Sequence, residues 1–596
     1  MLTTASVFLD TLRKAGVTHA FVNWGNDHPA FLEELERQRV EAGETALEIV
    51  TSPNEMVALS AAQGFAQVTG VPALVIVHVD CGTQALAGAV HNVDRGRTPV
   101  LIFAGMAPFS GQGELKGSKN EWPMWPQDVP DQAAIVRQYM RHCTQIMSGK
   151  NVSKTLLRAL QFAMSEPKGP VYISARREAL EEELDPQAAQ VTNAVDIKKW
   201  PAIYPTAVPQ DAVDTITDAL LSAKFPLILA GHTGRDTSTV EPLTQLADKL
   251  GIALFMAGSS AVSVPYSHPH FLGISFGGKN ALLDEADVIV VLDADVPWID
   301  AKGNAPRPGA KVFVVDPDPL KQTYGWSHVD ADIICRADVG VALRQLLAAA
   351  DAAAARIDTA AVAARSRALA ARHEELIAGF VRAEATLRDP AVAEPPFVLG
   401  ALRTAVAAHT PSHGAQTLWL NEGISNYPGV FDHIRPSVPG SMIASGGSSL
   451  GWALGAAVGT GLGAKGKHDL TVAVVGDGTF LFGVPSTAYW MARRYKTPYL
   501  TVIINNGGWA SPKASLLGIY PNGLGSQAPG SRLSVGFGPD MPDYSQIAAA
   551  AGGAWGRRVS DPAEFEQVFK EAIRVVLEEK RCAVVDCIVR SIEVVS

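Results

Sequence analysis

Short apolar runs rich in β-branched residues alternate with longer segments of helical periodicity, and this alternation occurs in three successive sets. Such runs are typical of parallel strands that are buried on both faces and joined by helices. The runs lie at 72–79, 98–104 and 170–175, at 226–230, 287–292 and 311–315, and at 470–475, 498–504 and 583–589. The pattern predicts an α/β protein with three doubly wound parallel-sheet domains, at 1–185, 205–350 and 390–596.

Two segments between these sets predict the domain boundaries. Residues 182–210 are rich in proline and polar residues and have no clear period, which is typical of a surface linker. Residues 348–388 are rich in alanine and dotted with charges, and the pair Pro395 and Pro396 follows them. We interpret this stretch as a connecting helix; a surface helix of the middle domain is the alternative.

Composition and charge narrow the class of protein. The chain has 596 residues, 47% hydrophobic and 18% charged, which is typical of a globular enzyme of roughly two to four domains. The net charge of −10 is spread without a run of basic residues, which argues against nucleic acid as a partner. Five scattered cysteines indicate neither a zinc site nor a disulfide framework. Residues 1–17 lack the pattern of a signal peptide, and no run approaches the about eighteen apolar residues of a membrane span, so we expect a cytoplasmic protein without membrane contact.

Carboxylate, carboxamide and glycine residues follow two apolar runs of the third domain. Gly-Asp-Gly at 476–478 ends one run, and Asn-Asn-Gly-Gly at 505–508 follows after one predicted helix and one further strand. Because the ends of neighbouring parallel strands meet at one edge, Asp477 and Asn506 can converge there. Their side-chain oxygens and the backbone oxygen of Gly508 suit Mg²⁺, and the helix that begins near Thr479 points free amides at the same phosphates. The triplet alone also fits an ordinary turn; the spaced asparagines favour the metal site.

These motifs resemble the diphosphate-binding motif of thiamine diphosphate enzymes, and residues 54–66 resemble the helix that carries the activating glutamate of that family. The resemblance implies thiamine diphosphate and Mg²⁺ as cofactors. It also implies that Glu55 shares a proton with N1′ of the aminopyrimidine, which favours the tautomer that generates the nucleophilic ylide. A carboxylate in apolar surroundings has a raised affinity for protons, which suits this role. Taken alone, Glu55 also fits a first-turn residue that faces the helix dipole.

The resemblance covers nearly the whole chain, in the domain order pyrimidine-binding, middle and diphosphate-binding that acetolactate synthase and benzoylformate decarboxylase share. Residues 418–422 and 450–454 are similar to the benzoylformate decarboxylase pattern, which implies that Leu450 is an apolar wedge under the cofactor; a core leucine is the alternative. Ser448 and Ser449 depart from that pattern. The cofactor-binding residues implied by the resemblance are Glu55, Asn421, Glu422, Leu450, Gly476, Asp477, Gly478, Thr479, Asn506 and Gly508.

Four polar residues are implied on the substrate side. His78 lies where benzoylformate decarboxylase has an active-site histidine, and it can relay protons. Asn26 and His28 lie in the loop after the first strand, from which relatives project polar groups into the site. Gln127 resembles the glutamine that acetolactate synthase-like enzymes place beside the thiazolium. A hydrogen-bonded structural histidine and solvated loop residues are the alternatives.

The middle domain carries a weak phosphate signal. Gly-His-Thr-Gly-Arg at 231–235 follows a predicted strand and could approach a phosphate, as a flavin site requires. The remaining glycines of this domain fit ordinary turns. We therefore expect that FAD is not required.

Three hypotheses about function follow. The leading one is a 2-oxo acid decarboxylase or carboligase, the second is a lyase or decarboxylase acting on acyl-coenzyme A, and the third is a non-catalytic regulatory subunit. Intact Glu55, Asp477 and Asn506 argue against the third. The resemblance further implies a 2-oxo acid or aldehyde substrate and a homo-oligomer, at least a dimer and by expectation a tetramer, in which two subunits build each site.

Overall fold

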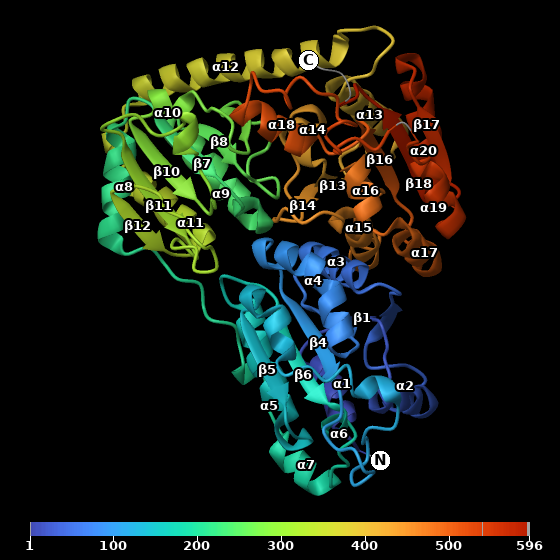
Figure 1. Ribbon diagram of the computed structural model, residues 1–596. Helices are drawn as coiled ribbons and strands as arrows, with labels where there is room; N and C mark the ends of the chain where they lie inside the picture. The colour runs from blue at the N-terminus through green and yellow to red at the C-terminus, as the bar shows by residue number, and fades with distance from the viewer. Residues whose placement is uncertain (1, 539, 593–596) are drawn as a thin grey trace.

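The computed structural model describes residues 2–538 and 540–592, and these residues form three six-stranded sheets, one for each predicted domain (Figure 1). The first sheet contains β1 (His19–Val22), β2 (Glu48–Thr51), β3 (Ala73–Val77), β4 (Val100–Met106), β5 (His142–Ile146) and β6 (Val171–Arg176). The second contains β7 (Pro226–Ala230), β8 (Ala253–Ala257), β9 (Phe271–Ser275), β10 (Val288–Leu292), β11 (Lys311–Asp316) and β12 (Ile333–Arg336). The third contains β13 (Thr417–Glu422), β14 (Met442–Ala444), β15 (Leu470–Gly476), β16 (Leu500–Asn505), β17 (Trp555–Val559) and β18 (Ala583–Ile588).

Helices connect these strands in all three domains. The pyrimidine-binding domain has α1 (Thr4–Lys14), α2 (Pro29–Ala42), α3 (Glu55–Thr69), α4 (Val79–Arg95), α5 (Val152–Met164) and α6 (Arg177–Leu180), followed by α7 (Pro186–Thr192). The middle domain has α8 (Gln210–Ser222), α9 (Val240–Leu250), α10 (Leu282–Glu285) and α11 (Val339–Ala352), followed by α12 (Thr359–Ala385). The diphosphate-binding domain has α13 (Pro395–His409), α14 (Tyr427–Ile434), α15 (Trp452–Gly463), α16 (Asp477–Phe482), α17 (Pro485–Tyr495), α18 (Ala510–Ile519), α19 (Tyr544–Gly552) and α20 (Phe565–Leu577).

The predicted fold class is confirmed by the sheet topology. The strand orders are β2-β1-β3-β4-β6-β5, β12-β11-β10-β7-β8-β9 and β14-β13-β15-β16-β18-β17, and each pairing between these strands is parallel. Every residue of β3, β7, β8 and β10 is buried, as expected for apolar strands with helices on both faces. In each sheet the chain order reverses near the centre, which is where open α/β sheets bind ligands.

Three connections differ from the sequence prediction. The linker contains α7, because Asp185 accepts the N–H of Ala188 and caps a short helix. The alanine-rich stretch is divided between α11 and α12, and Asp358 caps the second helix. Between Asp477 and β16 the chain forms α16 and α17 rather than one helix, because Val484 takes a left-handed conformation with φ of +48° before α17 begins.

The three domains share apolar cores rather than standing apart. In Figure 1 the middle and diphosphate-binding domains lie side by side under α12. The pyrimidine-binding domain meets the diphosphate-binding domain through α3 and α4. One core contains both Val57 of α3 and Trp452 of α15. Another contains both Leu254 of β8 and Val472 of β15. Over the described residues no helix is both long and apolar enough to cross a membrane.

Candidate active site

Asp477 lies at the carboxyl end of β15, where α16 begins, and it is 3% exposed. Its Oδ1 accepts the N–H of Gly478 and its Oδ2 accepts the N–H of Gly507, each at 2.9 Å. The second bond ties the turn after β15 to the turn after the neighbouring β16. Burial raises the pKa of Asp477 to about 6, although the backbone donors lower it. A cation beside this carboxyl group would therefore favour its charged form.

The two asparagines after β16 have different surroundings. Asn505 is 1% exposed, donates from Nδ2 to Oδ1 of Asp586 at 2.8 Å and accepts the N–H of Gly507 at 3.1 Å. Asn506 is less buried, and its Oδ1 accepts the N–H of Gly508 at 3.2 Å. Asn505 thus fixes the turn, and Asn506 keeps a carboxamide oxygen at the sheet edge.

Close packing explains two glycines of this edge. Gly508 has a φ of +154°, and a Cβ there would lie 2.2 Å from the backbone oxygen of Val535. A Cβ on Gly478 would lie 2.2 Å from the ring of Trp509. The backbone N–H of Trp509 donates to the backbone oxygen of Val535 at 2.8 Å. The residues around 535 and Trp509 therefore form a wall against the sheet edge, and any larger side chain at these glycines would displace it.

The chemistry of these groups fits the cofactors that the resemblance implies. A carboxylate, a carboxamide oxygen and a backbone oxygen are the hard ligands that Mg²⁺ prefers. Asp477, Asn506 and Gly508 offer them from adjacent turns. Gly476, Gly478 and Thr479 stand at the start of α16, and helix starts of this kind bind phosphates, although the N–H of Gly478 is itself donated to Oδ1 of Asp477.

Glu422, at the end of β13, caps the start of α15. Its two oxygens accept three backbone N–H groups at 2.7–2.9 Å, those of Gly451, Trp452 and Ala453. Burial raises the pKa of Glu422 to about 7, although these donors lower it. Asn421 is 1% exposed and donates to the backbone oxygen of Tyr427 at 3.0 Å. Glu422 therefore fixes the start of α15 and Asn421 fixes the turn that leads into α14, and direct contact of either with a cofactor stays a prediction.

Leu450 lies two residues before α15, whose N-cap is Gly451, and it is only partly buried, unlike the core residue Leu454. Ser449 holds the loop to the pyrimidine-binding domain, since its N–H donates to Oδ1 of Asn92 at 3.0 Å and its backbone oxygen accepts from Nδ2 of Asn92 at 2.7 Å. A partly exposed leucine on an anchored loop is better suited to the wedge role than to the alternative of a core leucine.

Glu55 is the first residue of α3, after the N-cap residue Asn54, whose side chain accepts the N–H of Val57. Nδ2 of Asn23 donates to Oε1 of Glu55 at 2.8 Å. The carboxylate is therefore held in one orientation by a neighbour from the loop after β1.

Helices α3 and α15 pack side by side in the same direction. Their contacts advance together along both helices, with Gly455 against Ser60, Gly459 against Ala61 and Gly463 against Thr69. Glu55 and Leu450 consequently lie at the same end of the helix pair. This packs elements of the two domains against each other within one chain, and the expectation that two subunits build each site stays a prediction.

His78, Gln127 and Cys81 lie together at the start of α4. Nδ1 of His78 is 2.6 Å from Oδ1 of Asp27, and Nε2 of Gln127 is 3.6 Å from Sγ of Cys81. Burial raises the pKa of the Cys81 thiol, and the charges of Asp80 and Glu55 raise it further. The charge of Glu55 therefore reaches this group, which connects the predicted substrate-side residues with the start of α3.

His28 lies on the buried side of this group, with Nδ1 3.2 Å from the Asp27 oxygen that contacts His78. His28 is fully buried, with Trp24, Phe31 and Phe103 around its ring. Asn26 is partly exposed and donates from Nδ2 to Glu121 at 2.9 Å.

Sequence reasoning missed Asn23 and Asp27, which stand in the same loop as Asn26 and His28. A turn directs neighbouring side chains to different sides, so the loop was identifiable from the sequence and the residue within it was not.

A second group with metal-ligating side chains lies in the middle domain, formed by Asp248, His268 and His270. Nδ1 of His268 accepts the N–H of His270 at 3.1 Å, so in the neutral imidazole Nε2 carries the hydrogen. That nitrogen lies 3.3 Å from Oδ1 of Asp248, which is an ion pair when His268 is protonated.

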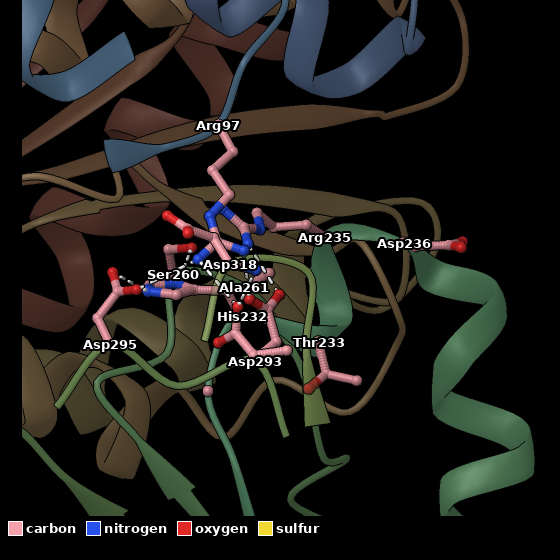
Figure 2. A network of polar contacts seen from close by, with 12 residues as sticks. Arg97, His232, Thr233, Arg235, Asp236, Ser260, Ala261, Asp293, Asp295 and Asp318 are labelled. Carbon is pink, nitrogen blue, oxygen red and sulfur yellow. Dashed lines mark hydrogen bonds and ion pairs between the residues drawn. The ribbon is translucent and has the colours of Figure 1, made fainter. Parts of the chain in front are cut away.

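The segment 231–235 follows β7, beside β10, where the strand order of the middle sheet reverses. Arg97 of the pyrimidine-binding domain enters this crevice (Figure 2). Its guanidinium lies 2.7 Å from Asp293, 3.4 Å from Asp295 and 3.5 Å from Asp316. The side chain of Arg97 is 7% exposed, so a side chain of the same protein fills the position that a ligand takes in related sheet topologies.

The residues of this segment pair within the crevice. His232 contacts Oγ of Ser260 at 2.8 Å and Asp295 at 3.1 Å, as Figure 2 shows. Arg235 pairs with Asp293 at 2.8 Å. A Cβ on Gly231 would lie 2.2 Å from the backbone oxygen of Asp293, so this glycine serves close backbone packing.

Sequence models of one family match all three domains. The N-terminal TPP binding domain of thiamine pyrophosphate enzymes matches residues 2–135, the central domain matches 213–346, and the C-terminal TPP binding domain matches 423–587. Together the three matches span well over half of the chain and follow the order of the three sheets.

Individual relatives are similar over nearly the full length. Benzoylformate decarboxylase from Pseudomonas aeruginosa is 24% identical over 541 residues, which cover 89% of this chain and 91% of the relative. Acetolactate synthase from Bacillus subtilis is 22% identical over 584 residues, which cover 96% and 90%. The solved structure of the thiamine diphosphate-dependent 4-hydroxybenzoylformate decarboxylase from Rhodococcus jostii RHA1 has a TM-score of 0.75 at 21% identity over 100% of both chains, which shows a shared fold.

Proposed function

Because the chain belongs to the thiamine pyrophosphate enzyme family, we propose that it is a thiamine diphosphate- and Mg²⁺-dependent 2-oxo acid decarboxylase or carboligase. The observation that carries the proposal is the packing of α3 against α15, with Glu55 and Leu450 at the same end of the pair. Similarity to benzoylformate decarboxylase and acetolactate synthase over most of both chains supports the reaction class.

Each residue has a distinct part in this proposal. Thiamine diphosphate, when bound, supplies a nucleophilic carbon and an electron sink for cleaving a bond next to a carbonyl. Glu55 holds a proton for the aminopyrimidine, and Asn23 keeps its carboxyl group in place. Leu450 presents an apolar side chain to the cofactor. His78 delivers a proton to the carbon from which CO₂ has left, and Gln127 contacts Cys81, three residues after His78.

The metal and the diphosphate are held at the edge of the third sheet. Asp477, Asn506 and the backbone oxygen of Gly508 bind Mg²⁺, and residues 476–479 bind the diphosphate. The burial of Asp477 supports this part, because a cation offsets the cost of its charge. The bond between Asp477 and Gly507 supports it as well, since it holds the two turns together.

We also infer that the enzyme requires no flavin, because Arg97 and its carboxylate partners fill the crevice of the middle sheet. A holoenzyme reconstituted with thiamine diphosphate and Mg²⁺ alone should turn over at the full rate. A rate that rises on addition of FAD would contradict this inference.

The proposal includes a homo-oligomer, at least a dimer and by resemblance a tetramer. Large apolar side chains are exposed on the pyrimidine-binding and diphosphate-binding domains, which supports an interface. They include Trp122 at 80%, Tyr520 at 62% and Leu524 at 91% exposure. Light scattering of the holoenzyme tests this, and a fully active monomer would show that one chain completes a site.

The test of the function is CO₂ release from a panel of 2-oxo acids that includes pyruvate and benzoylformate. Metal-stripped protein is assayed with thiamine diphosphate and Mg²⁺, added singly and together. We expect release that requires both additions and ranks the acids by size. No release from any acid, with cofactor bound, would instead favour acyl-coenzyme A substrates.

The Glu55→Gln variant tests the mechanism. It should keep the fold and the Mg²⁺ affinity but lower kcat about a hundredfold or more, because the proton held by the carboxyl group is lost. Glu44→Gln, which changes an exposed glutamate just before β2, is the matched control and should leave kcat unchanged. Full turnover by Glu55→Gln would exclude the assigned role.

A further inference from the structure

The imidazole of His78 is held by a buried carboxylate. Asp27 is 1% exposed, its Oδ1 lies 2.6 Å from Nδ1 of His78, and its Oδ2 accepts the N–H of Val79 at 3.3 Å. The His78 side chain is 20% exposed. One ring nitrogen is therefore held inside the protein, while part of the ring remains accessible.

The neighbouring His28 does not compete for this carboxylate. Nδ1 of His28 accepts the N–H of Gly25 at 3.0 Å, so that nitrogen has no hydrogen to donate to Asp27, which is 3.2 Å away. Burial lowers the pKa of His28, which keeps the ring neutral near pH 7. The hydrogen between Asp27 and His78 therefore comes from His78.

The backbone around the pair is shaped to fit it. A Cβ on Gly25 would lie 2.0 Å from Nδ1 of His78, and a Cβ on Gly105 would lie 1.7 Å from Oδ2 of Asp27. Val79 has a φ of +35°, a conformation that is costly for a β-branched residue, and its N–H points at Asp27. The lack of side chains at Gly25 and Gly105 leaves room for the contact between Asp27 and His78, and the strained backbone of Val79 supplies a further donor to Asp27.

We propose that Asp27 is a positioning residue, which holds His78 in the tautomer with hydrogen on Nδ1 and so presents Nε2 to the reacting carbon. This inference rests on the proposed decarboxylase function. Nε2 of Gln127 lies 3.6 Å from Sγ of Cys81, three residues after His78, and the charge of Glu55 raises the pKa of that thiol. The accessible side of His78 therefore belongs to the same group as the start of α3.

The proton balance defines what His78 does. Loss of CO₂ from the 2-oxo acid leaves an electron pair on the former carbonyl carbon, and one proton must reach that carbon to give the aldehyde. The imidazolium gives its Nε2 proton and water returns it, so no oxidant or reductant is consumed. Asp27 stays ionised throughout and keeps its bond to Nδ1.

Several groups set the charge of His78. Asp27 from the loop after β1, Asp80 from α4 and Gln127 from the loop after β4 act on His78 directly. The surrounding groups are His28 from the loop after β1, Cys81 from α4 and Glu55 from α3, whose charge acts on Cys81. Burial by itself lowers the pKa of His78, but the hydrogen bond and charge of Asp27, the charge of Asp80 and the side chain of Gln127 raise it above the ordinary value. The imidazolium is therefore available closer to neutral pH.

The first test is the Asp27→Asn variant of the holoenzyme, which keeps the shape and removes the charge. We expect the alkaline limb of the kcat profile to move down by about one pH unit, and kcat at pH 7 to fall about tenfold while KM stays constant. Asp131→Asn, which changes an exposed carboxylate of the same domain, is the matched control. An unchanged alkaline limb in Asp27→Asn would overturn the proposal.

A double variant separates positioning from a general structural role. In a His78→Gln background, Asp27→Asn should lower kcat by less than twofold, because the ring that it orients is gone. If the two substitutions lower kcat independently, Asp27 acts on something other than His78.

An NMR titration gives a readout that needs no turnover. Histidines labelled at Cε1 report the pKa of His78, whose signal is identified by its loss in His78→Gln. Asp27→Asn should lower this pKa by about one unit. If no 2-oxo acid is turned over but the pKa of His78 still shifts, the proposed function is wrong and the interaction of Asp27 with His78 is supported. An unchanged pKa of His78 would overturn the positioning role of Asp27.

Discussion

At the scale of single residues, burial governs several carboxyl groups that have no cationic partner on the same atoms. It raises the pKa of Asp477 to about 6, that of Glu422 to about 7 and that of Asp432 to about 6. Backbone or hydroxyl donors lower these values only in part, because a hydrogen bond does not replace the water that burial removes. The charge on these groups therefore changes between about pH 6 and pH 7.

Asp432 allows a pH prediction, because its Oδ1 accepts a hydrogen bond from the hydroxyl group of Tyr266 at 2.9 Å across the boundary between two domains. The folded-state pKa of about 6 lies above the ordinary value of 3.8, so protonated Asp432 favours the fold. This contribution is complete below pH 3.8 and is lost as the pH rises through 6. Asp432→Asn keeps the acceptor and removes the charge, so between pH 5 and pH 8 its free energy of unfolding should rise relative to that of the wild type by about 1 kcal/mol, out of about 3 kcal/mol for the whole shift of the pKa, and its melting temperature should rise with it.

The matched control for this experiment is Asp284→Asn, since Asp284 is exposed on α10. Its melting temperature should follow the wild type at both pH values. A difference between Asp432→Asn and the wild type that stays constant from pH 5 to pH 8 would contradict the assigned role of the Asp432 charge.

At the scale of elements, the glycines of α15 determine how closely it approaches α3. A Cβ on Gly459 would lie 1.8 Å from the backbone oxygen of Ala61, which cannot move without shifting the helix. We expect Gly459→Ala to destabilise the protein by about 1 to 3 kcal/mol and to lower kcat, because separating the helices moves Glu55 from Leu450. Thermal unfolding and kcat measure the two effects.

Replacing glycine by alanine should have the opposite effect on stability in α12. Gly379 lies within α12, and a Cβ there would meet only the end of the Arg382 side chain, at 3.8 Å. Gly379→Ala should therefore be neutral or stabilise the protein by up to about 1 kcal/mol, through helix propensity alone. Equal effects at both positions would mean that the α3–α15 contact does not limit stability.

Elements with a strong apolar pattern were predictable from the sequence. The runs at 226–230 and 470–475 correspond to β7 and β15, because a strand that is buried on both faces must be apolar throughout. Short strands such as β14, which has three residues, carry no such pattern and depend on their neighbours for pairing. The division between α16 and α17 depends on the left-handed conformation of Val484, which periodicity does not predict.

The site was predictable in its motifs but not in its contacts. Spacing and strand order were enough to bring the turn of Asp477 to the turn that follows β16. The cap that Glu422 forms on α15 depends on a carboxylate reaching a helix start about thirty residues later, and spacing does not reveal that distance. Asp27 was missed for the same reason, since its partner His78 comes from a different strand end.

At the scale of the whole molecule, Arg97 connects the pyrimidine-binding domain with the middle domain. Arg97 follows the end of α4, the helix that begins beside His78. Nearby, the guanidinium of Arg95 donates to Oγ1 of Thr323 at 2.6 Å and lies 4.0 Å from the ring centre of Tyr324. Both ends of α4 are thus fixed, one at the predicted substrate-side group and the other in the crevice of the middle sheet.

Removing the charge of Arg97 should therefore be costly. Arg97→Met leaves Asp293 buried with one fewer cation, and we expect a loss of about 3 to 5 kcal/mol. Adding Asp293→Asn to this variant should restore part of the loss, because the unpaired charge is removed as well. Arg13→Met, which breaks an exposed pair with Asp10, is the control and should cost less than about 1 kcal/mol. If Arg97→Met melts at the same temperature as Arg13→Met, the crevice does not hold the domains together, and the argument that it excludes a flavin loses its support.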